Sequence, residues 1–164
     1  MPELQRLRAE HATAVLDFEL ANRAWFAASV PDRGDAFFDR FTDRYDALLA
    51  EQEAGVCAFH VLVAEDGSVL GRFNLVDIEN GSAHLGYRVA QHVAGHGVAT
   101  ATVRQLCRSA PDRYGLRTLR AAVAHRNAAS RKVLIKAGFV PVDAAAPDDL
   151  SGEPGTCYER DLSH

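Results

Sequence analysis

Two short dipeptides, Asp66-Gly67 and Asn80-Gly81, divide the middle of the chain and constrain its fold most strongly. The runs around them, VCAFHVLVAED, VLGRFNLVDIE and SAHLGYRVA, are rich in β-branched and aromatic residues. Asp-Gly and Asn-Gly between such runs are strong short-range signals for β-hairpins. The sequence therefore predicts three antiparallel strands joined as a meander.

Helical and extended patterns alternate on both sides of this meander. LQRLR predicts a short first strand, and apolar residues at three- and four-residue steps predict the helices. The further elements expected are helices over 12–28, 37–49, 98–109 and 128–136, with Gly138 ending the last one, and strands in 116–124, FVPVDA and TCYERDL. This order predicts an α+β (mixed α/β) fold in one domain over residues 1–164.

Aromatic residues recur on one face of the second predicted helix. Phe37, Phe38, Phe41 and Tyr45 lie at steps of three and four residues within it. Such a stripe favours a place in the core over a binding groove.

The charge balance and the cysteines limit the function classes. Lys and Arg number 18 against 22 Asp and Glu, a formal charge of −4, which argues against a general nucleic-acid binder. Cys57, Cys107 and Cys157 show no C-x-x-C spacing, which indicates reduced thiols. No apolar run reaches the ~18 residues that span a bilayer, so we expect a cytoplasmic protein without membrane contact. His92 and His96 lack a third ligand at a fixed spacing, so we expect no metal.

A glycine-rich turn, AGHGVAT, precedes the helix predicted to begin near Val98. The first N–H groups of a helix have no partner within it, and glycine lets a phosphate approach them closely. Thr100 stands where a dinucleotide-binding fingerprint has its third glycine, and the chain has no Gly-Lys-Ser/Thr of a P-loop. The turn by itself is compatible both with a phosphate site and with a plain tight turn.

A second motif, HRNAASRKVLIKAGF, follows the turn by about thirty residues. Together the two segments resemble the GNAT acetyltransferases, most closely the RimJ/RimL-like enzymes that acetylate the N-termini of ribosomal proteins. The matching residues of the second motif are Asn127, Ser130, Val133, Leu134, Lys136, Gly138 and Phe139. HLGYRVA before the turn and ANRAW near the N-terminus fit the same family.

This resemblance implies a fold, an activity and a set of binding residues. The fold would be a mostly antiparallel mixed sheet of about six to seven strands flanked by about four helices. The activity would be transfer of an acetyl group from acetyl-CoA to a primary amine, most favourably a peptide or protein N-terminal α-amine. The alternatives are a small-molecule amine acceptor, a catalytically silent CoA-binding domain and a nucleotide-binding module. The residues implied to bind acetyl-CoA are Val89, Ala94, Gly95, His96, Gly97, Val98, Ala99, Thr100, Asn127, Ser130 and Arg131.

Two of these implied residues have alternative structural roles, and a third stands in for a missing family residue. Asn127 is also a favourable N-cap for the helix from Ala128, and both roles can coexist. Arg131 fits a solvated helix charge as well as a phosphate ligand. The Tyr that many GNAT enzymes carry seven residues after the Asn is Leu134 here, so Ser130 becomes the candidate acid for the departing thiolate.

The candidate base is His84, in the strand before the glycine turn. If Asn80-Gly81 is a two-residue turn with uninterrupted pairing, Asp77 lies directly opposite His84 and orients its imidazole as a proton acceptor. The alternative is an exposed polar pair, and a one-residue slip in register separates the two side chains. The resemblance also implies association into a homodimer, to which the aromatic residues of the first 50 positions can contribute.

Overall fold

The computed structural model describes residues 1–163, which form two compact units. The first unit contains Met1–Val76 and Tyr87–Ala94, and the second contains Asp77–Gly86 and the chain from Gly95 onward. Two long strands, β3 (Val69–Glu79) and β4 (Ser82–Val89), each contribute residues to both units.

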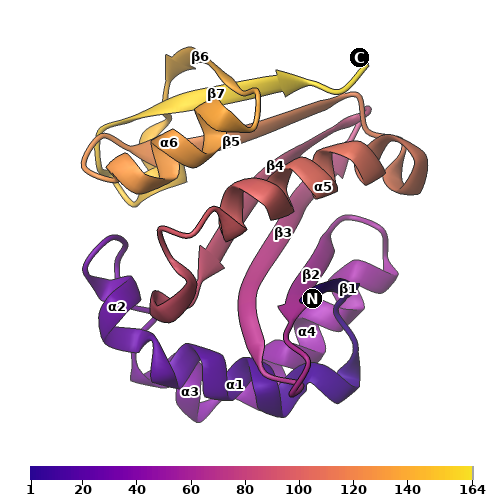
Figure 1. Ribbon diagram of the computed structural model, residues 1–164, viewed down its shortest axis with the longest axis vertical. Coiled ribbons are helices and arrows are strands. Elements are labelled where there is room, and N and C mark those ends of the chain that lie inside the picture. The colour runs from indigo at the N-terminus through magenta and orange to yellow at the C-terminus, as the bar shows by residue number, and fades with distance from the viewer. Residues whose placement is uncertain (164) are drawn as a thin grey trace. The chain divides into compact units, whose positions relative to one another are not determined.

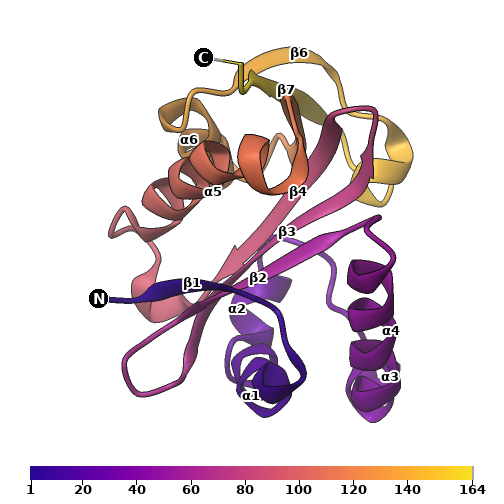
Figure 2. The same ribbon diagram turned by 90° about the vertical axis from the view of Figure 1, so that its right-hand side faces the viewer.

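The first unit places four helices on one face of its strands (Figure 2). Besides the parts of β3 and β4, its elements are β1 (Glu3–Arg6), η1 (Ala9–His11), α1 (Ala12–Ala21), α2 (Arg23–Ala27), α3 (Asp35–Asp39), α4 (Phe41–Glu53), β2 (Ala58–Val63) and η2 (Gln91–Val93). β1 pairs with β2, and β2 with β3, both antiparallel.

Aromatic side chains from these helices form the core of the first unit. Phe37, Phe41 and Tyr45 are buried together with Phe59 and Val61 of β2. The rings of Phe37 and Phe41 meet edge to face with centroids 5.8 Å apart, a favoured geometry for aromatic pairs. The prediction that the aromatic stripe belongs to the core is confirmed.

Each of the two predicted N-terminal helices is interrupted. The first breaks at Asn22, whose side-chain N–H donates to the Phe18 carbonyl and whose amide oxygen accepts from the backbone N–H of Gln91, at 3.0 and 2.9 Å. Binding a residue so distant in sequence holds Asn22 out of helical geometry. The second breaks at Arg40, between α3 and α4.

The second unit packs two helices against its strands. Its further elements are α5 (Val98–Tyr114), β5 (Thr118–Ala124), α6 (Ala128–Lys136), β6 (Val140–Ala144), η3 (Pro147–Leu150) and β7 (Gly155–Asp161). α5 and α6 contact each other and lie on the same side of β5 and β7 (Figures 1 and 2). Val103, Leu119 and Leu134 are fully buried between these layers.

Helix α5 is longer than the sequence predicts. It continues through Pro111 to Tyr114, and Gly115 then closes it in the left-handed conformation with φ 66°. Proline removes one backbone hydrogen bond, but it stands within the last turn of this helix. The predicted end near Ser109 is therefore wrong by about a turn.

The strands follow the hydrogen-bonded order β1-β2-β3-β4-β5-β7-β6. β4 and β5 pair in parallel, and the pairs β5–β7 and β6–β7 are antiparallel. The predicted mixed, mostly antiparallel sheet of about six to seven strands is confirmed. Residues 1–163 hold six α-helices where about four were expected, because the N-terminal pair is split. None of the helices in the described part of the chain is long and apolar enough to cross a membrane.

Candidate active site

The glycine turn leads directly into the N-terminus of α5. Gly95 and Gly97 have φ values of 81° and 78°, a backbone conformation that side chains disfavour. A Cβ atom built on either glycine would meet no atom of the chain within 4 Å, so the space beside the turn is open. The N–H groups of Val98, Ala99 and Thr100 have no carbonyl partner within α5, because they belong to its first turn. Open space beside free N–H groups favours an anionic ligand.

Helix α6 begins in the same unit with a side-chain cap. The amide oxygen of Asn127 accepts a hydrogen bond from the backbone N–H of Ser130 at 3.2 Å, so its predicted capping role is confirmed. Arg131 is half-buried, and its Nε atom is buried without a hydrogen-bond partner among the described residues. A buried guanidinium nitrogen without a partner is costly, and an anion at this position would satisfy it.

The predicted base lies on a strand that leaves its partner early. Within the described residues, the parallel pairing covers Ser82–His84 of β4 and Thr118–Arg120 of β5, whereas β5 continues to Ala124. His84 is half-buried and lies beside Arg120 in this register. The part of β5 beyond the pairing presents backbone N–H and C=O groups on that edge, which suits an extended ligand with amide groups of its own.

The turn between β3 and β4 has the predicted two-residue geometry. Asn80 and Gly81 both have positive φ, 52° and 77°, as a type I′ hairpin turn requires. This confirms the predicted two-residue turn from which the pairing of β3 with β4 was counted.

The pairing further along these strands corrects the position of Asp77. Counting from the turn would place Leu70 opposite Gln91, but the N–H of Ala90 donates to the Leu70 carbonyl at 2.8 Å. β3 therefore holds one extra residue between this pair and the turn. Asp77 has a left-handed φ of 53°, which marks a bulge there, so it does not form a regular one-to-one pair with His84. The uninterrupted pairing assumed from the sequence is wrong.

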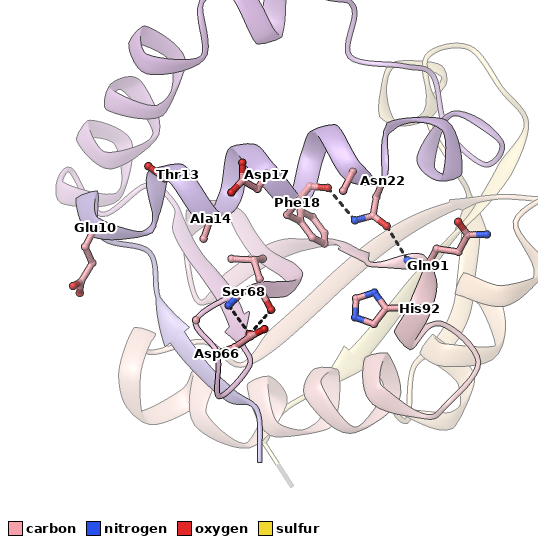
Figure 3. A pocket seen from close by; sticks show the side chains of 13 residues that line it. Glu10, Thr13, Ala14, Asp17, Phe18, Asn22, Asp66, Ser68, Gln91 and His92 are labelled. Carbon is pink, nitrogen blue, oxygen red and sulfur yellow. Dashed lines mark hydrogen bonds between the residues drawn. The ribbon is translucent and has the colours of Figure 1, made fainter.

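Val89 and Ala94 belong to the first unit, and the other residues predicted to bind acetyl-CoA belong to the second. The first unit also contains a groove of about 800 Å³ (Figure 3). Helix α1 forms one wall, and the turn before Val69 and the segment Gln91–His92 lie across from it. The groove carries acidic side chains, those of Glu10, Asp17 and Asp66, which sequence reasoning missed.

A charged cluster in the first unit was also missed. Glu19 of α1 is 1% exposed and is contacted by three arginines: Arg33 at 3.0 Å, Arg72 at 2.7 Å and Arg88 at 3.4 Å. We call these four residues the Glu19 cluster. The available signal was the presence of Glu19 and Arg72 within two largely apolar segments, VLDFEL and VLGRFN. Periodicity alone does not show that these two charges meet.

Burial and charge act against each other within the Glu19 cluster. Burial alone would raise the pKa of the Glu19 carboxyl, but Arg33 and Arg72 outweigh it and lower this pKa below its ordinary value. Burial, reinforced by the charge of Arg33, lowers the pKa of Arg88 to about 10. One carboxylate is thus fully ionised among three guanidinium groups.

These features of the second unit suit a ligand with phosphates and an extended arm, because the N-terminus of α5 is open and β5 has a free edge. A family model described as an acetyltransferase (GNAT) domain matches residues 3–140, and the chain belongs to this family. It is an acyltransferase that uses acetyl-CoA as co-substrate and acetylates a primary amine. A search of curated protein sequences found no significant match.

Solved structures share this fold over nearly the whole chain. The ribosomal-protein-S5-alanine acetyltransferase of Vibrio fischeri is 20% identical with a TM-score of 0.89, covering 99% of this chain and 93% of that one. RimJ of Mycobacterium smegmatis, in complex with CoA-disulfide, is 24% identical with a TM-score of 0.84, covering 96% and 80%. Spermidine N-acetyltransferase of Vibrio cholerae, with CoA and spermine, is 17% identical with a TM-score of 0.78, covering 99% and 96%.

Proposed function

We propose that this enzyme transfers the acetyl group of acetyl-CoA to the N-terminal α-amine of a peptide or protein. The observation that carries the transfer is the open glycine turn at the start of α5, together with the likeness to ribosomal-protein acetyltransferases. Amine chemistry favours this acceptor over lysine. At pH 7 an α-amine with a pKa near ~7.7–8.0 costs about 1 kcal/mol to deprotonate, whereas a lysine near ~10.4 costs about 4.6 kcal/mol.

The binding residues are assigned by what each can donate. The backbone N–H groups from Gly95 to Thr100, His96 among them, would hold the pyrophosphate, and Arg131 would add a charged donor. The region around Asn127 would meet the pantetheine arm while Asn127 continues to cap α6. Val89 and Ala94, which flank the turn on the first-unit side, complete the proposed set. These groups fit a ligand that carries phosphates at one end and amides along its length.

The transfer itself needs a proton acceptor and a proton donor. The amine nitrogen forms a bond to the acetyl carbon, and the bond from that carbon to sulfur breaks. His84 would take a proton from the ammonium through a water molecule, which leaves the neutral amine that attacks, and the amide nitrogen releases its second proton after the bond forms. Ser130, at the start of α6, would return a proton to the departing thiolate. Asp77 remains in the proposed set only as a nearby carboxylate, since its bulge removes the direct pairing.

Replacement of the proposed base should change the rate and its pH dependence. In the His84→Ala variant we expect acetyl transfer at pH 7 to fall by about 100-fold. Affinity for acetyl-CoA should stay within about twofold, because the proposed phosphate contacts lie elsewhere. Part of the lost rate should return at pH 9, where the amine deprotonates without help. An unchanged rate at pH 7, measured by thiol release, would remove His84 from the mechanism.

The acidic groove of the first unit favours a second candidate acceptor, a polyamine, because Glu10, Asp17 and Asp66 attract cations. A panel decides between the two classes. Short peptides with free α-amines, polyamines, aminoglycosides and free amino acids are offered at equal concentration, and acetyl transfer is read by thiol release. We expect kcat/KM for the best peptide to exceed that for any small amine by at least tenfold. Turnover of small amines alone would refute the peptide assignment.

We further propose that the protein forms a homodimer in solution. Trp25 and Leu20, which are partly exposed on the N-terminal helices, are available for such an interface. Sedimentation at tens of micromolar should show the mass of two chains, and a single-chain mass would contradict this.

A further inference from the structure

The Glu19 cluster holds more positive charge than its fold requires. Three guanidinium groups surround one carboxylate, which leaves a surplus of two positive charges. Burying charge is costly unless it is paired, and a single arginine would already neutralise Glu19. Asp32 and Asp35, the nearby carboxylates, are instead engaged by Arg23 at 2.8 and 2.9 Å. Arg23 with these two carboxylates leaves one negative charge, and Asp32 acts on Arg88 through space, so the two groups together keep a surplus of one positive charge.

Two of the three arginines are both accessible and held in place. The Arg33 and Arg88 side chains are 30% and 21% exposed, whereas that of Arg72 is 6% exposed. Arg33 stacks over the ring of Phe37 at 4.7 Å, and Arg88 over that of Phe26 at 4.9 Å. Stacking on a ring and bonding to Glu19 together restrict each guanidinium to one orientation. Such restriction lowers the entropic cost of binding a partner.

The guanidinium groups of Arg33 and Arg88 have more N–H donors than the protein uses. A guanidinium has about five N–H donors and no acceptor. Among the described residues, the side chain of Arg88 makes one hydrogen bond, a long one of 3.4 Å from Nη1 to Glu19. Arg33 directs Nε and one Nη to the same carboxylate. Free, fixed, charged donors suit the planar oxygens of a carboxylate.

We infer that Arg33 and Arg88 bind an acidic side chain of the acceptor, so that the substrates are peptides with Glu or Asp close to the acetylated N-terminus. This inference rests on the proposed function and names the substrate class more narrowly. Burial and then the charge of Arg33 lower the pKa of Arg88, and a bound anion would offset the second of these causes. A carboxylate entering here would make charge-assisted hydrogen bonds in a partly water-excluded place, where they are stronger than in water.

The test compares peptides that differ only in charge. The peptides are amidated at the C-terminus, begin with a free α-amine on alanine, and carry either glutamate or glutamine at the second, third or fourth position. Binding is measured by calorimetry, and by the fluorescence of Trp25, the only tryptophan, in the presence of CoA. For the wild type we expect at least one glutamate peptide to bind about tenfold more tightly than its glutamine partner, with the preference shrinking in high salt. No preference at any of the three positions would overturn the inference.

Two variants and a control test whether the preference for glutamate peptides arises from the Glu19 cluster. Arg88→Gln and Arg33→Gln should each reduce the glutamate preference to less than threefold, and Arg8→Gln should retain it. Arg8 is a matched control because it is an exposed arginine of the same unit that pairs with Glu10. A preference that survives in both cluster variants, or is lost in the control, would contradict the inference.

Two further outcomes identify the bound anion and distinguish peptide binding from acetyl transfer. In the first outcome, Arg88→Gln lowers the affinity for acetyl-CoA as much as the affinity for the glutamate peptide, and the variant has no such effect on the affinity for 3′-dephospho-CoA. The anion bound by Arg88 is then a CoA phosphate, and the inference is wrong. If the wild type binds the glutamate peptide preferentially but transfers no acetyl group to it, the proposed function fails while the binding inference stands.

Discussion

The Gly97→Val variant is expected to lose acetyl-CoA binding by at least about 100-fold. Gly97 has φ 78° and ψ 3° at the N-cap of α5, and no atom of the chain lies within 4 Å of the place where a Cβ would stand. A branched side chain there would occupy the open space through which phosphates reach the N–H groups of the first turn. It would also strain the left-handed backbone by about 1–3 kcal/mol, shifting those groups. Calorimetric titration with acetyl-CoA measures the loss.

The same helix supplies the matched control. Gly115 closes α5 at its other end, also left-handed with φ 66° and also with open space around its Cβ position. Gly115→Val should therefore destabilise the fold to a similar extent and leave acetyl-CoA affinity within about threefold. Equal losses of affinity in the two variants would show that helix stability, and not access of the phosphates, accounts for the effect.

Removal of the Glu19 charge is expected to destabilise the first unit by about 3–5 kcal/mol. Glu19→Gln leaves Arg72, which is 5% exposed, without a counter-charge and beside two other guanidinium groups. Breaking a buried ion pair from one side costs about this much, because the remaining charge stays buried. Denaturant unfolding followed by circular dichroism gives the free energy of unfolding. Glu153→Gln is the control: its pair with Arg126 is at the surface, so the loss should be under about 1 kcal/mol.

The difference in unfolding free energy between the wild type and Glu19→Gln should shrink in acid. The pKa of the Glu19 carboxyl is lowered in the folded protein from its ordinary 4.5. Its contribution to stability is therefore fully present above about 4.5 and is lost as the pH falls through the lower folded value. The gap in unfolding free energy between wild type and Glu19→Gln should narrow below pH 4.5. A gap that stays constant into acid would show that the charge of Glu19 is not its source.

Local sequence signals predicted the elements well where local chemistry determines them. Asn80-Gly81 adopts the type I′ turn, Asn127 caps α6, and Gly138 follows that helix with φ 93°. Each of these outcomes depends on a residue's own backbone preference or on a partner three positions away. The glycine turn before α5 belongs to the same group, and Gly97 is its N-cap.

Features set by distant partners were not predictable in this way. Helix α1 ends at Asn22 because that side chain binds Gln91, and periodicity within the helix carries no sign of it. The bulge at Asp77 follows from how two strands align over their full length, which the turn alone does not fix. The Glu19 cluster likewise joins α1 with β3 and β4. The predictions of a single domain and of the acetyl-CoA and catalytic residues stay predictions.

The most direct test of the proposed function is acetyl transfer itself. The purified protein is incubated with isotopically labelled acetyl-CoA and a peptide that carries both a free α-amine and a lysine, and the product is mapped by tandem mass spectrometry. The proposed function predicts one labelled acetyl group on the α-amine, with one CoA thiol released per acetyl transferred and no product when the α-amine is blocked. Tight binding of acetyl-CoA without any transfer, or label on the lysine alone, would contradict it.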